Sequence, residues 1–292
     1  MSLRGRYIID RIHQAIGHRF RVPCPPYHEP SYWDKGVYKS LGPSDVYEWG
    51  DIHWNDDLEE HSYDLLLKEN CGNLQFMNNL AHCWTIKLPS DDSNTKTSFR
   101  EALGLQSKTT NTDTGNREEN IMLLGCGNSK LGEYMAQSYQ FKGNTNIIQV
   151  DISQKLVSNM ESRCSSYLES GVMSIVEDDA TCLSAFSNNS VSAVVDKGLI
   201  DAFYCSKHPQ SLVQISSVLQ SVNRVLIPGG FFTLFSFSRP EFLLDAANGE
   251  RGNLSLWKNL QVRKLPNILM YRFEKRMLKK SNRRNIQNHS RR

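Results

Sequence analysis

The stretch that decides the fold reads Leu123-Leu124-Gly125-Cys126-Gly127-Asn128-Ser129. The apolar run over 121–124 predicts a buried strand, and the residues from about Lys130 to Tyr139 predict a helix. A strand, a glycine-rich turn and a helix in this order are typical of a βα unit in a parallel sheet. Glycines in such a turn let a ligand approach the backbone where a Cβ atom would exclude it.

Short apolar runs alternate with helix-like segments downstream, which predicts further βαβ units. The later strands are expected over 147–150, 172–176, 191–195 and 231–237, with a hairpin of 256–265 and 268–273 around Pro266-Asn267. Helices are expected over 154–168 and 211–226, and Pro228-Gly229-Gly230 is expected to end the second. The predicted fold is therefore α/β and Rossmann-like: a seven-stranded, mostly parallel sheet with helices on both faces and a C-terminal antiparallel hairpin.

The glycine turn and a following acid predict a nucleoside site. The dinucleotide fingerprint has a third glycine three residues after the second, but Lys130 stands there. A cofactor without phosphate groups fits better, and S-adenosylmethionine is such a cofactor. Asp151 ends the second expected strand, 26 residues after Gly125, where a carboxylate can accept hydrogen bonds from both ribose hydroxyls. Asp151 or Ser153 can also cap the next helix, and both roles can hold together.

Acidic residues also follow the third and fourth expected strands. Asp178 and Asp179 come after the third, and either can accept a hydrogen bond from an adenine amine. Asp179 is favoured of the two, and a solvated acidic turn is the alternative. Asp196 and Lys197 end the fourth strand, at the sheet edge where ligands bind in open α/β folds. The two can instead form an ion pair of little energetic value.

Six motifs together resemble one family. They are 124–129, 150–153 and 195–202 in the core, Tyr32–Lys35 and Tyr47–Asp51 upstream, and Asn223–Gly230 near the end. In this order they resemble the eukaryotic methyltransferase-like proteins, of the class I seven-β-strand type, that methylate lysines of translation elongation factor 1-alpha. The resemblance covers roughly 31–55 and 121–275.

The resemblance implies which residues bind S-adenosylmethionine: an aromatic lid, the glycine turn, a ribose acid, an adenine acid and a lysine near the transferred methyl group. In that order these are Trp33, Tyr38 and Trp49; Gly125 with Gly127; Asp151 with Ile152; Asp179 with Ala180; and Lys197. The aromatic residues can alternatively pack as core. The sequence departs from the family pattern at Gly50, where an aromatic residue is usual, and at Leu199, where threonine is usual.

A lysine acceptor sets a further requirement, because its amine has a pKa of about 10.4 in water and must lose a proton before it attacks. Desolvation lowers that pKa. Asp196 or Asp201 is predicted to orient the ammonium or to accept its proton through water. No His/Cys/Asp cluster at ligand spacing is present in the sequence, so no metal is expected.

The sequence divides into five predicted parts. A basic leader or helix (1–30) precedes a lid with helices (31–88), a polar insertion (89–120), the catalytic core (121–275) and a basic tail (276–292). The insertion has too few apolar residues to offset the entropy of ordering, which predicts disorder. The acid-poor amphipathic start is a short surface helix or a mitochondrial presequence. The tail is solvated, or it contacts RNA or an acidic protein.

Net charge, cysteine content and apolar runs limit the partners and the compartment expected for this chain. The chain has 292 residues and a net charge of +3, so global nucleic-acid binding is not indicated. Its seven cysteines are scattered without a C-x-x-C pair, which favours a reducing compartment. No apolar run approaches the roughly 18 residues of a membrane span. We expect a monomer in the cytoplasm, with the mitochondrion as the alternative.

The expected function is S-adenosylmethionine-dependent methylation of a protein lysine, with elongation factor 1-alpha as the expected partner. The alternatives are methylation of a small molecule or RNA, and a catalytically silent module that binds the cofactor. The Asn/Asp-Pro-Pro-Tyr signature of base methylation is absent from the sequence. A nicotinamide oxidoreductase is disfavoured by Lys130.

Overall fold

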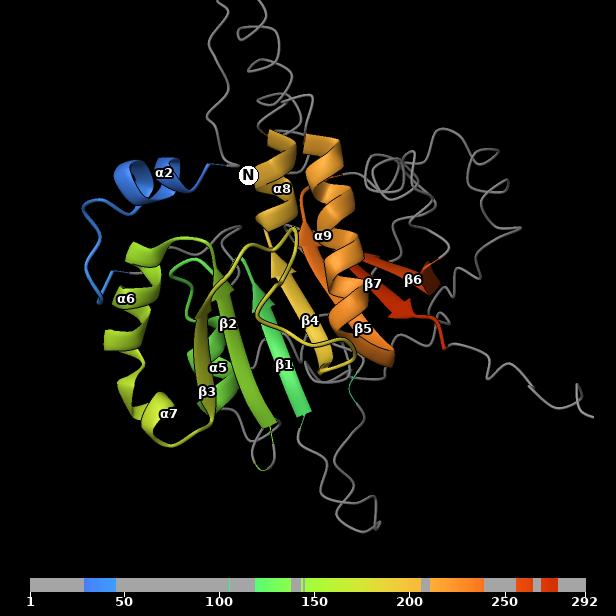
Figure 1. Cartoon of the computed structure of the whole chain (residues 1–292), viewed down its shortest axis with the longest axis horizontal. Coiled ribbons are helices and arrows are strands. Elements are labelled where there is room, and N and C mark those ends of the chain that lie inside the picture. The colour runs from blue at the N-terminus through green and yellow to red at the C-terminus, as the bar shows by residue number, and fades with distance from the viewer. Residues whose placement is uncertain are drawn as a thin grey trace, which may run out of the picture.

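The computed structural model confirms the predicted fold class. It describes residues 29–45, 105, 119–137, 143, 145–205, 211–238, 256–264 and 269–277. Seven strands form one sheet in the order β3-β2-β1-β4-β5-β7-β6 (Figure 1). They are β1 Glu119–Leu124, β2 Thr145–Asp151, β3 Met173–Glu177, β4 Val191–Lys197, β5 Leu226–Ser236, β6 Trp257–Lys264 and β7 Leu269–Lys275. β1 to β5 pair in parallel, whereas β7 is antiparallel to β5 and β6.

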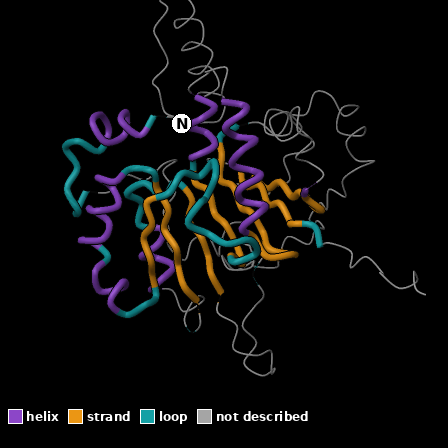
Figure 2. The backbone as a smooth tube through the Cα atoms, viewed as in Figure 1, coloured by secondary structure: helices purple, strands orange, loops and turns teal. Residues whose placement is uncertain are grey.

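Helices cover both faces of this sheet, and Figure 2 shows the strands as one layer flanked by helices. They are α2 Pro30–Tyr32, the π-helical turn η1 Trp33–Val37, α5 Leu131–Gln137, α6 Gln154–Arg163, α7 Ser165–Glu169, α8 Leu199–Cys205 and α9 Ser211–Val225. Alternate residues of a strand point to opposite faces. Met122 of β1 accordingly packs in the cluster that contains Val218 of α9, and Ile121 packs with Met135 of α5.

The structure corrects two local predictions. The helix expected over 154–168 is two helices, because the backbone leaves helical geometry at Cys164. The segment Pro228-Gly229-Gly230 does not end the preceding helix, which stops at Val225; it lies within β5. The β4–β5 register shifts at this point, because Leu226 pairs with Val191 but the next pair joins Phe231 to Ala193. The Pro-Gly-Gly segment lies in the unpaired part of β5 between these two pairs.

The structure also adds elements that the sequence patterns did not predict. Glu119 and Asn120, which were expected to end the polar insertion, are the first residues of β1. Helix α8 was not predicted, because seven residues give too little periodicity to distinguish a helix. Trp49, the leader and most of the insertion and tail lie outside the described residues. Within the described ranges, no helix is long and apolar enough to cross a membrane.

The register shift in β5 leads to the first prediction. A Cβ atom on Gly230 would lie 2.8 Å from the carbonyl oxygen of Ser192 and 3.0 Å from that of Ile227. Gly230→Ala should therefore lower the free energy of unfolding by about 1–3 kcal/mol, measured by urea titration. Gly36→Ala is the matched control, since no atom lies within 4 Å of its added methyl group. Equal effects of the two substitutions would contradict the strained register.

Candidate functional site

The turn between β1 and α5 needs glycine at its first position. Gly125 and Gly127 both have left-handed backbones, with φ of +56° and +54°. A Cβ atom on Gly125 would lie 2.8 Å from the Cβ of Leu199, and one on Gly127 would lie 3.4 Å from the Tyr38 hydroxyl. Side chains are strained in this region of φ and would fill the space beside the turn. The backbone of the turn is thus kept open at the end of β1.

Asp151 at the end of β2 is bonded directly to that turn. Its Oδ2 accepts from the amide of Gly127 at 3.0 Å, and its Oδ1 accepts from the amide of Ser153 at 3.0 Å. Each carboxylate oxygen has a second lone pair that can accept from a ribose hydroxyl. Burial raises the pKa of Asp151, and the nearby charge of Asp34 adds to this shift. Ser153, not Asp151, caps α6, because its hydroxyl accepts from the Leu156 amide at 3.1 Å.

Two aromatic residues of the predicted lid stack on each other, and one of them, Tyr38, lies beside this turn. We call residues 29–45 the strap. The rings of Trp33 and Tyr38 stack with centroids 5.7 Å apart, and Tyr38 is buried against Leu156 and Met160 of α6. The strap also contains Asp34, whose carboxylate accepts a hydrogen bond from the hydroxyl of Ser153 at the start of α6. The structure therefore places Tyr38 next to the glycine turn and Trp33 against Tyr38.

The loop after β3 separates the roles of its two acids. The buried Asp178 accepts from the amides of Asp179 and Ala185 and from the Ser184 hydroxyl, at 2.8–3.1 Å. Its carboxylate thus holds the loop. The half-buried Asp179 uses Oδ1 to accept from the amide of Thr181 at 2.8 Å. This arrangement favours Asp179 as the acid available to an adenine amine, which stays a prediction.

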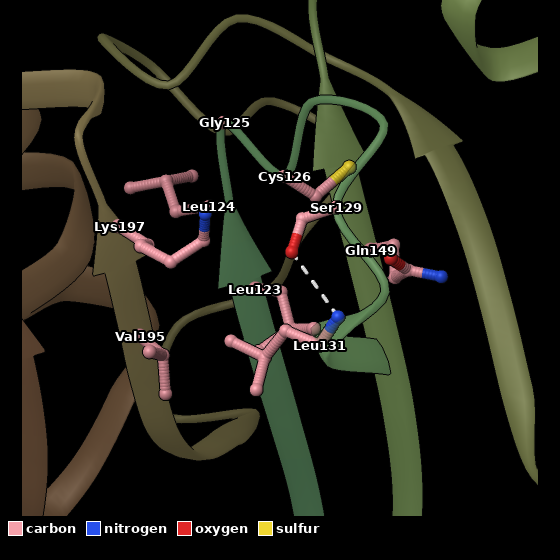
Figure 3. Close-up of a pocket in the computed structure, with 9 residues that line it drawn as sticks. All are labelled: Leu123, Leu124, Gly125, Cys126, Ser129, Leu131, Gln149, Val195 and Lys197. Atoms are coloured by element: carbon pink, nitrogen blue, oxygen red, sulfur yellow. Dashed lines mark hydrogen bonds between the residues drawn. The ribbon is translucent and has the colours of Figure 1, made fainter. Parts of the chain in front are cut away.

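A small pocket lies beside the glycine turn (Figure 3). Figure 3 shows the Lys197 side chain extending from β4 toward Leu124, and shows Ser129 bonded to the first amide of α5. The lining residues are Leu123, Leu124, Gly125, Cys126, Ser129, Leu131, Gln149, Val195 and Lys197. Two of the predicted cofactor residues, Gly125 and Lys197, are therefore brought together. Ile152 lies between Asp151 and the cap of α6, and Ala180 is buried in the loop after Asp179.

The two predicted catalytic acids are buried, and both oxygens of each accept hydrogen bonds from the protein. Asp196 is 0% exposed, and its two oxygens accept from the amides of Leu199 (2.7 Å) and Ile200 (3.1 Å), the first two residues of α8. Asp201 is 3% exposed and accepts from the hydroxyls of Ser236 and Ser238 and the amide of Phe237. Burial, with a smaller contribution from the charge of Asp201, raises the pKa of Asp196 to about 7.

Sequence reasoning assigned no role to two residues at this site. Asp34 stands within the quoted Tyr32–Lys35 motif, but nothing in the motif shows that it meets Ser153 across 119 positions of sequence. Arg163 falls inside the helix predicted over 154–168, where its residue type carries no signal, yet it bonds to the glycine turn. In the described part of the chain, no cluster of three His, Cys, Asp or Glu side chains could hold a metal ion.

The sheet order, the open glycine turn and the carboxylate of Asp151 at the end of β2 are the features predicted for a nucleoside-binding α/β domain. Residues 121–230 match the family described as "Methyltransferase domain". The site lies within this matched segment, and the match supports S-adenosylmethionine as its cofactor. The turn fits that cofactor, because its glycines leave the backbone accessible and Asp151 has acceptor capacity for a ribose.

Two curated relatives indicate which methyltransferases the chain resembles. The chain is 33% identical over 128 residues to "eEF1A lysine and N-terminal methyltransferase" of Bos taurus, covering 44% of this chain and 17% of the relative. It is 30% identical over 133 residues to "EEF1A lysine methyltransferase 4" of Mus musculus, covering 43% and 48%. The match thus spans less than half the length of either relative. The resemblance to this family, read from the motifs, is confirmed.

The separation of Asp178 from Asp179 can be tested by alanine substitution. Asp179→Ala should raise the Kd for S-adenosylhomocysteine about tenfold in calorimetry, through loss of one charged hydrogen bond. Its unfolding free energy should change by less than about 0.5 kcal/mol. Asp178→Ala should instead lower stability by about 1–3 kcal/mol, because the buried loop amides lose their acceptor. The reverse pattern would assign the adenine to Asp178.

The raised pKa of Asp196 has a consequence for stability. Between about pH 4 and 7 the folded protein holds a proton that the unfolded chain has released, so this group makes stability fall as pH rises. Asp196→Asn removes the titration. The unfolding free energy of wild type minus that of the variant should shrink by a few kcal/mol at most between pH 4 and 7, and level off above 7. Urea unfolding at several pH values measures it, and a constant difference would contradict the shift.

Proposed function

We propose that this chain is an S-adenosylmethionine-dependent protein-lysine N-methyltransferase that acts on a translation elongation factor. One observation carries the proposal most directly: the amide of Gly127 donates to Asp151 beside the stacked rings of Trp33 and Tyr38. A carboxylate, an open backbone turn and an aromatic cover are the features that a nucleoside with a positively charged sulfur would need.

The residues of the chain divide the work of binding. Asp151 accepts from the ribose hydroxyls, and Asp179 accepts from the adenine amine. The bound cofactor supplies a methyl group already activated on a sulfonium sulfur. Trp33 and Tyr38 cover that site and exclude water, and an aromatic face near a cation is worth about 0.5–2 kcal/mol. Alignment of the acceptor amine with the methyl–sulfur bond then lowers the barrier by several kcal/mol.

Asp196 and Asp201 act on the acceptor side. The prediction that one of them takes the lysine proton through water stays a prediction. Because their oxygens already accept from α8 and from the turn after β5, we assign them first to positioning these two segments. Replacement of each by Asn separates the roles: an unchanged pH dependence of turnover would remove proton transfer and leave positioning.

The relatives are named for lysine methylation of eEF1A, and this likeness supports a protein-lysine substrate for the chain. We carry over elongation factor 1-alpha as the proposed protein substrate. We also propose a cytoplasmic monomer whose basic tail, residues 276–292, contacts RNA or an acidic surface of the substrate. Methylation of RNA or of a small molecule, and a silent cofactor-binding module, are the alternatives that the experiment below distinguishes.

The test is transfer of radiolabelled methyl from S-adenosylmethionine into a eukaryotic lysate. Wild type should label a band of the size of elongation factor 1-alpha, and Asp151→Ala should abolish it by removing the ribose acceptor. Glu161→Ala, which removes an exposed acid of α6, is the matched control and should label normally. A chain lacking residues 278–292 should lose the salt dependence of substrate capture if the tail contributes.

Each other outcome has a distinct meaning. Label that is sensitive to nuclease rather than to protease would replace the protein substrate with RNA. Cofactor binding in calorimetry without any label would favour the silent module. Absence of both label and binding would contradict the proposed methyltransferase activity.

A further inference from the structure

Arg163, the last residue of α6, joins three segments that are distant in sequence. Its Nη1 donates to the carbonyl oxygen of Asn128 at 3.0 Å, and its Nη2 donates to that of Ser129 at 2.9 Å. Both carbonyls belong to the turn that contains Gly125 and Gly127. A planar guanidinium can hold two neighbouring carbonyls at once, which a lysine ammonium does less well. Arg163 therefore fixes the far end of the glycine turn.

The same guanidinium reaches the strap. Nη1 of Arg163 also lies 3.5 Å from the carbonyl oxygen of Asp45, which accepts from the side-chain amide of Asn128 at 3.1 Å. The end of the strap is thus bonded both to the glycine turn and to the arginine that holds the turn. A second contact fastens the strap to α6 alone, because the Asn159 side chain donates to the carbonyl of Leu41 at 2.9 Å.

An ion pair with α5 holds the guanidinium in place. Nε of Arg163 lies 2.7 Å from Oε1 of Glu133, and the two side chains are 12% and 11% exposed. Charges this far from solvent are screened little by salt. Removing the arginine would leave both the carboxylate and the carbonyls of the turn with unmet bonds.

We propose that Arg163 is a positioning residue that couples the strap to the glycine turn, so that closure of the strap and binding of the cofactor form one equilibrium. The inference rests on the cofactor site of the proposed function. Because the turn and the strap share one guanidinium, either segment in its bound geometry favours the other. By linkage, a cofactor that stabilises the bound geometry of the turn must also stabilise the closed geometry of the strap.

The test compares three variants of the full chain by amide hydrogen exchange, first without cofactor. Arg163→Lys should speed exchange about tenfold in both 33–45 and 125–131, since the shared bonds weaken together. Asn159→Ala touches only the strap contact, so faster exchange in the turn would report the coupling itself. Arg224→Lys is the matched control, because Arg224 likewise donates to carbonyls, but those of Cys182, Leu183 and Phe186.

Addition of S-adenosylhomocysteine completes the experiment. Wild type should gain protection in both segments, and Arg163→Lys should bind about tenfold more weakly and protect the strap less. Unchanged strap exchange in Arg163→Lys, or equal loosening of the strap in Arg224→Lys, would overturn the inference. The inference would also be overturned if the glycine turn of the Asn159→Ala variant exchanged its amides at the wild-type rate. Failure of wild type to bind the compound contradicts the proposed function, while the cofactor-free exchange still decides the coupling.

Discussion

The site depends on the bond between the amide of Gly127 and the carboxylate of Asp151. This bond joins the turn after β1 to the end of β2, and the amide of Cys126 joins the same two segments by donating to the carbonyl of Val150. Only a left-handed backbone at Gly125 and Gly127 gives the turn this course. The carboxylate is therefore buried where a cofactor would need it, and its raised pKa is the electrostatic cost of that position.

The aspartates around this bond fall into two groups. All five acids accept from backbone amides; Asp151 and Asp179 are the proposed cofactor acceptors, whereas Asp178, Asp196 and Asp201 hold a loop, the start of α8 and the turn after β5. Asp178, Asp196 and Asp201 satisfy buried backbone amides that would otherwise be costly to leave unpaired.

Much of the core could be predicted from the sequence, because the apolar runs of a parallel sheet and a glycine turn are local signals. The strands, the helices on both faces and the positions of Gly125 and Asp151 at strand ends follow from them. The β5 register shift and α8 could not be predicted, because they depend on pairing between strands and on a cap supplied by Asp196. The bonds of Arg163 and Asp34 join segments far apart in sequence, for which residue type alone carries no signal.

The most direct measurement is a crystal structure of the full chain with S-adenosylhomocysteine. We expect the ribose hydroxyls within hydrogen-bond distance of the Asp151 carboxylate and the nucleoside beneath Trp33 and Tyr38. A ligand bound elsewhere, or one bound with the ribose away from Asp151, would contradict the cofactor site described for this fold.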